Sequence, residues 1–160
     1  MNVAELRKQL IALLDGGQAH ASFGDVVKNF PAELQGVVPE GLPYSAWQLL
    51  EHLRLAQEDI LLFSKNYDGK YESPKWPEGY WPKQAQPPTD DAWNASVKRV
   101  EEDLKAFKDL IEDENGDLFA PFAWGEGQNL LREALLIADH NAYHLGEMLV
   151  VRRLLGAWNK

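Results

Sequence analysis

The chain has 160 residues, 45% hydrophobic and 26% charged, which fits a single folded domain over residues 1–160 and argues against disorder. Its formal charge of −9 disfavours binding to nucleic acids or to anionic membranes. Because the sequence contains no cysteine, any metal site must use histidine or carboxylate ligands. The N-terminus is typical of an amphipathic helix and not of a secretory signal, and no apolar run is long enough to span a bilayer. We therefore expect a cytoplasmic protein.

The first half of the chain predicts two long helices with a shorter one between them. Leucines recur at helical spacing from Asn2 to Asp15, and two glycines then interrupt the pattern. We expect a short helical segment over Ser22–Asn29, followed by a connection rich in proline and glycine. Ser45 and Gln48 match a capping box, and an apolar stripe continues from there to about Lys65.

The segment Tyr67–Pro88 holds five prolines, which exclude a long helix, together with Trp76, Tyr80 and Trp81. We expect a loop that packs on the domain, because its aromatic side chains favour anchoring over free movement. Loops of this length are often functional lids.

Two more helices follow in the second half of the chain. The first should begin with Thr89 or Asp90 as its cap and end near Asn115-Gly116, and an aromatic loop, Asp117–Gly127, should follow. The last helix should run from about Gln128 to Leu155, with Gly156 as the C′ residue. Without strand patterns, these elements predict an all-α four-helix bundle with long aromatic and proline-rich loops between helices 2 and 3 and between helices 3 and 4.

Three of the four histidines are candidate metal ligands. His140 and His144 are four residues apart in the last predicted helix, so both imidazoles project from one face, on the flank of the apolar stripe. His52 lies on the flank of the stripe of the second long helix. Such histidines can instead be hydrogen-bonded core residues, but three of them on two facing helices favour a metal site with an open fourth position.

Several further residues are candidates for the same site. Asp59 lies two turns beyond His52, and Glu147 lies one turn beyond His144, so either carboxylate could be a ligand, an orienting partner of a ligand or a general base. The alternative is that both are boundary charges facing solvent. His20 could line the same pocket, but its position after the glycine pair favours a loop residue without that role.

Two segments resemble a known family. Ser45–His52 (SAWQLLEH) resembles the start of the second helix in the DinB-like (DinB/YfiT) superfamily, and Asp139–Glu147 (DHNAYHLGE) resembles its last-helix H-x-x-x-H motif. The resemblance covers essentially the whole chain. It implies a four-helix bundle, often a homodimer, in which His52, His140 and His144 bind Ni, Zn, Mn, Fe or a similar ion.

The resemblance also implies candidate functions for what would be a bacterial protein. Characterised relatives include thiol-dependent S-transferases, which suggests a metal-dependent enzyme acting on a small molecule, with a low-molecular-weight thiol as a possible partner, or a hydrolase. Alternatives are a non-catalytic, stress-related binding protein with a structural or sensory metal, and a purely structural helical protein. No substrate-binding motif is recognisable, so the reaction class stays open.

Overall fold

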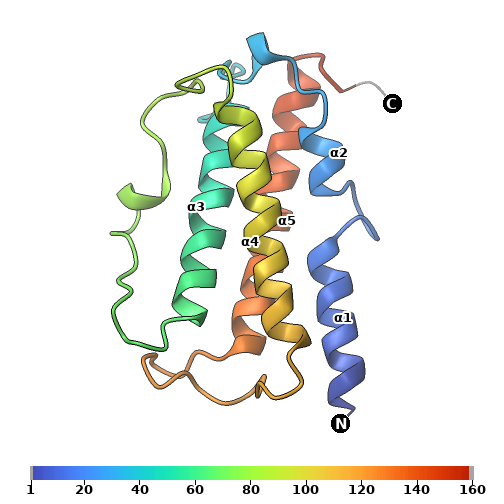
Figure 1. The fold of residues 1–160 in the computed structure, drawn as a ribbon. Helices are drawn as coiled ribbons and strands as arrows, with labels where there is room; N and C mark the ends of the chain where they lie inside the picture. The colour runs from blue at the N-terminus through green and yellow to red at the C-terminus, as the bar shows by residue number, and fades with distance from the viewer. Residues whose placement is uncertain (1, 159–160) are drawn as a thin grey trace.

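The computed structural model describes residues 2–158, and over these residues the chain forms α-helices and short 3₁₀ segments without any strand, which confirms the all-α prediction. Four helices are long and one is short (Figure 1). The α-helices are α1 (Val3–Asp15), α2 (Phe23–Val27), α3 (Ala46–Ser64), α4 (Ala92–Glu112) and α5 (Leu130–Leu154), and the 3₁₀ segments are η1 (Ala32–Leu34) and η2 (Glu78–Tyr80).

Most helix boundaries have the local causes that the sequence predicts. Ser45 and Gln48 form both hydrogen bonds of the capping box that begins α3, and Ser22 begins α2 with a second capping box. Gly156 follows α5 with a φ of 69°, the left-handed conformation that suits glycine. The predicted cap of α4 is wrong: the N-cap is Asp91, without a side-chain cap hydrogen bond, in place of Thr89 or Asp90.

The long helices pack lengthwise against one another. Helix α3 contacts both α4 and α5, and α1 packs against α4 and α5 from the other side (Figure 1). Buried apolar side chains form two clusters along these contacts, one around Trp47 and Leu50 and the other around Phe107 and Ile137. Burial of this apolar surface is the main term that stabilises the arrangement.

The direction of the helices explains one of the long loops. Helices α3 and α4 run in the same direction in Figure 1, whereas α5 runs opposite to both. At 1.5 Å per residue, the 19 residues of α3 span about 28 Å. The chain must cover that distance again before α4 can begin, so residues 65–91 return along the outer side of α3 (Figure 1).

None of the helices over residues 2–158 combines the length and the apolar character that a membrane crossing requires.

Candidate metal centre

The three histidines that the sequence singles out lie together. His52 comes from the middle of α3 and is only 1% exposed, and His140 and His144 come from adjacent turns of α5. The Nε2 atom of His52 is 3.0 Å from the Nε2 of His140 and 3.1 Å from the Nε2 of His144. One nitrogen from each ring therefore faces the same small space, and all three lie within 4.8 Å of one another.

Hydrogen bonds at the far side of two rings fix which nitrogen faces that space with a lone pair. Nδ1 of His52 is 2.9 Å from the backbone carbonyl oxygen of Tyr80, which can only accept, so His52 must donate through Nδ1–H. Nδ1 of His144 is 2.7 Å from Oε2 of Glu147, and the same reasoning applies to the carboxylate. Neutral His52 and His144 thus present unprotonated Nε2 atoms to each other, which is the tautomer that metal ligands adopt.

The cluster remains uncharged near neutral pH. Burial lowers the pKa of His140 to about 4, and repulsion from His144 and His52 acts in the same direction. Burial also lowers the pKa of His144 to about 4, with His52 contributing, and it lowers the pKa of His52. Because protonation is disfavoured, the lone pairs stay available to a cation.

The donor set fits a divalent transition metal. Two lone pairs facing each other at 3.1 Å, as at His52 and His144, repel unless a cation or a proton lies between them, and the low pKa values disfavour the proton. In a tetrahedral site with Zn–N bonds of about 2.0–2.1 Å, neighbouring ligand nitrogens are about 3.3 Å apart, close to the separations found here. Imidazole ligands suit Zn, Ni, Cu and Fe.

The returning loop between α3 and α4 covers the cluster. The indole of Trp81 stacks on the His52 ring with a centroid distance of 3.9 Å and an interplanar angle of 7°. Tyr44 stacks on the other face of Trp81 at 4.1 Å. The loop therefore contributes both the carbonyl group that orients His52 and the aromatic ring that shields it from water.

Comparison with known protein families agrees with this geometry. A family model described as the DinB superfamily matches residues 17–148, a range that includes all three histidines. The chain belongs to the DinB superfamily. No curated protein and no solved structure matches the chain.

In this DinB protein, the other sequence candidates take distinct positions. Glu147 hydrogen-bonds His144, as an orienting partner would. Asp59 lies outside the three-histidine group and accepts hydrogen bonds from the hydroxyls of Tyr71 and Tyr80, at 2.9 and 2.8 Å. Burial, reinforced by Asp59, raises the pKa of Tyr80 to about 12, so this hydroxyl remains a donor. Asp59 therefore holds in place the residue whose backbone carbonyl orients His52.

His20 is exposed, and its Nδ1 is 3.0 Å from the carbonyl oxygen of Ala21. It does not join the three-histidine group. Sequence reasoning placed Tyr80 and Trp81 in a packed loop but did not predict their contacts with His52, since those contacts depend on the path of the loop.

Proposed function

We propose that this DinB protein is a metal-dependent enzyme that acts on a small molecule, in a reaction of the thiol S-transferase or hydrolase type. The observation that supports this proposal is the convergence of three Nε2 atoms, from His52, His140 and His144, in a neutral cluster that is buried at His52 and partly buried at the other two. Three protein ligands are typical of catalytic metal sites, which keep a further position for water or substrate.

The chain's own residues would then have separate tasks. The three histidines would hold a divalent ion such as Ni, Zn, Mn or Fe, which in such sites acts as a Lewis acid and lowers the pKa of a coordinated water or thiol. Tyr80 and Glu147 keep Nδ1 of their histidine partners protonated and the rings in position. Glu147 also lines a cavity next to the cluster, so it is our candidate general base, whereas Asp59 positions Tyr80.

The proposal extends to the setting of the protein. We infer a bacterial, cytoplasmic homodimer in which each chain forms one domain over residues 1–160, a four-helix bundle of the DinB type made by α1, α3, α4 and α5. The substrate would be a small molecule, with a low-molecular-weight thiol as the candidate second substrate. An acidic chain with a charge of −9 supports the absence of nucleic-acid and membrane partners.

One observation favours a second candidate function, a stress-related binding protein with a structural or sensory metal. His52 is 1% exposed beneath Trp81, and structural sites are closed to solvent. The two functions differ in whether a small ligand exchanges at the ion. Displacement of coordinated water by a thiol, followed in the absorption spectrum of the cobalt-substituted protein, would favour the enzyme, and an unchanged spectrum would favour the structural site.

The first test is the metal content of the protein purified without an affinity tag, measured by elemental mass spectrometry. We expect about one divalent ion per chain in the wild type and a loss of most of it in His140→Ala and His144→Ala. His20→Ala is the matched control, because it removes an exposed histidine outside the cluster and should leave the content unchanged. A wild type that neither contains nor binds a divalent ion would refute the proposal.

A further inference from the structure

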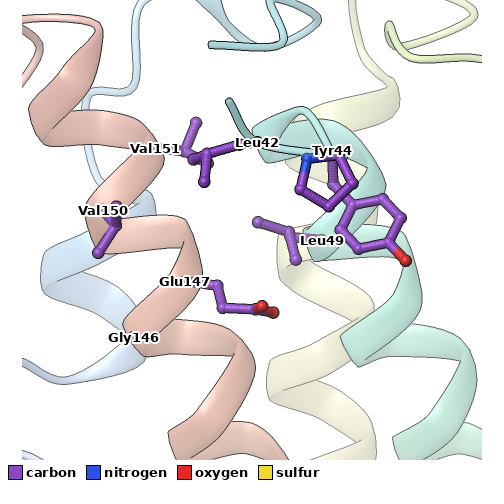
Figure 2. Close-up of a pocket in the computed structure, with 8 residues that line it drawn as sticks. Leu42, Tyr44, Leu49, Gly146, Glu147, Val150 and Val151 are labelled. Atoms are coloured by element: carbon purple, nitrogen blue, oxygen red, sulfur yellow. The ribbon is translucent and has the colours of Figure 1, made fainter. Parts of the chain in front are cut away.

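A cavity lies between α3 and α5, beside the histidine cluster. Its volume is about 280 Å³. A cavity of about 150 Å³ can bind benzene, so this one has room for a substituted ring or a branched chain of similar size. The side chains in Figure 2 converge on it from the segment before α3, the first turn of α3 and the second half of α5; the lining residues are Leu42, Pro43, Tyr44, Leu49, Gly146, Glu147, Val150 and Val151.

The cavity adjoins the cluster on two sides. Glu147, whose carboxylate extends into the space between the helices in Figure 2, is the residue that hydrogen-bonds Nδ1 of His144 at 2.7 Å. Tyr44, on the α3 side, stacks on Trp81, which in turn stacks on His52. A group bound in the cavity would therefore contact a partner of His144 and the outer ring of the stack on His52.

The chemistry of the lining selects for uncharged, apolar groups. Aliphatic side chains form most of the walls, and Glu147 supplies the one charge among the described residues that line the cavity. An anion would lose its hydration and meet a carboxylate in a chain whose formal charge is already −9. An aromatic or branched aliphatic group would instead bury apolar surface without an electrostatic cost.

Gly146 keeps the cavity accessible. It lies within the 25-residue helix α5, where alanine would be more favourable by about 0.5–1 kcal/mol. Its backbone does not have a positive φ, and an added Cβ atom would meet nothing within 4 Å. Neither backbone conformation nor close packing therefore requires a glycine here, and the space that its missing side chain leaves is part of the cavity.

We propose that this cavity binds an uncharged apolar group, aromatic or branched aliphatic, of the small molecule on which the metal centre acts. The inference rests on the proposed function for the identity of the reaction, but the ligand class follows from the cavity itself.

The test is a titration of two fluorinated probes of equal ring size, 4-fluorobenzyl alcohol and 4-fluorobenzoate, followed by ¹⁹F NMR. The protein is used as purified and again after chelation, and the two probes are compared after chelation, when no ion can attract the carboxylate. Gly146→Leu places a side chain into the cavity, and Arg153→Leu places the same side chain at an exposed position of α5 that does not line it. Metal content and helical content are measured for every variant.

We expect the alcohol to bind the wild type and Arg153→Leu with the same affinity. Its affinity for Gly146→Leu should be lower by at least about tenfold. The benzoate should bind the wild type about tenfold more weakly than the alcohol does. If Gly146→Leu loses helical content, Val150→Phe at the cavity rim replaces it, with the same expectation, since Val150 is 43% exposed.

Equal binding of the alcohol to the wild type and to the folded cavity variant would overturn the proposal. So would absence of binding to the wild type, including the case of a dimer that covers the cavity with a second copy, which sedimentation would reveal. The two proposals fail separately. If the protein binds the alcohol as expected but binds no metal, the proposed function is refuted and the ligand class is supported. If it binds metal but not the alcohol, the ligand class is refuted and the proposed metal site is supported.

Discussion

Acidification should destabilise the metal-free protein over a pH range that His140 and His144 determine. Burial lowers the pKa of each to about 4, from an ordinary value of 6.5. The unfolded chain therefore binds protons at these histidines at a higher pH than the folded chain does. It follows that their contribution to stability is fully present above about pH 6.5 and is lost as the pH falls toward 4.

The size of the effect follows from the same values. A pKa lowered from 6.5 to about 4 corresponds to about 3 kcal/mol for one histidine. Both rings are partly exposed and interact with each other, so solvent screening and coupling reduce the sum. We expect about 3 kcal/mol for the pair, which is a large fraction of the roughly 5–15 kcal/mol that stabilises a typical domain. Burial raises the pKa values of Glu133 and Asp103, and their contribution has the opposite sign.

The assay is urea denaturation followed by circular dichroism, with a chelator present, at several pH values between about 7 and 4.5. A double variant, His140→Gln with His144→Gln, removes these two titrating groups but keeps His52, Glu133 and Asp103, whose pKa values burial also shifts. The difference in slope therefore reports on His140 and His144. The free energy of unfolding of the wild type should fall by about 3 kcal/mol more than that of the double variant. His20→Gln should retain the wild-type slope. Equal slopes for the wild type and the double variant would refute the reasoning.

Three further outcomes can be measured on the same protein. Glu147→Gln should lower metal affinity by about 10–100-fold in a competition titration with a chelator, because it weakens the acceptor that orients His144, and a change below about twofold would contradict that role. Arg152→Met should lower the free energy of unfolding by about 3 kcal/mol, because the buried guanidinium donates to backbone carbonyl groups at and after the end of α2; an unchanged urea midpoint would exclude this role. Phe107→Ala should cost about 3–5 kcal/mol, since the ring is 0% exposed, whereas Leu62→Ala, at 36% exposure, should cost less than about 1 kcal/mol, and equal costs in calorimetry would contradict the core assignment.

The parts of the structure that were predictable from the sequence are those with local causes. The capping box at Ser45 and the left-handed Gly156 depend on a few neighbouring residues, and both are present. The pairing of His140 with His144 follows from helical periodicity alone. His52 can reach His140 and His144 only if α3 and α5 face each other. The apolar stripes of the two helices indicated this, because each histidine lies on the flank of a stripe.

Features that depend on distant contacts were not predictable in the same way. Arg152 lies in the last turn of α5, where a positive charge interacts favourably with the helix dipole. Its side chain is nevertheless only 7% exposed and donates hydrogen bonds to carbonyl groups at and after the end of α2. Arg7 of α1 likewise donates to the carbonyl groups of Ile111, in the last turn of α4, and of Gly116, in the loop after it. In both cases a buried arginine binds carbonyl groups in the last turn of another helix and in the loop after it, and no pattern within one helix indicates that.

The topology links the long loop to the site. Because α3 and α4 run in the same direction, residues 65–91 must return along α3 (Figure 1). On this path the loop contacts His52 of α3. There, the carbonyl of Tyr80 orients His52 and Trp81 covers the His52 ring. Asp59, about two turns further along α3, accepts a hydrogen bond from the hydroxyl of Tyr80. An antiparallel α3 and α4 joined by a short turn would leave His52 without this carbonyl and this cover. The crossover is therefore part of the candidate metal centre as well as a connection, because it supplies the carbonyl group and the aromatic ring that hold and cover His52.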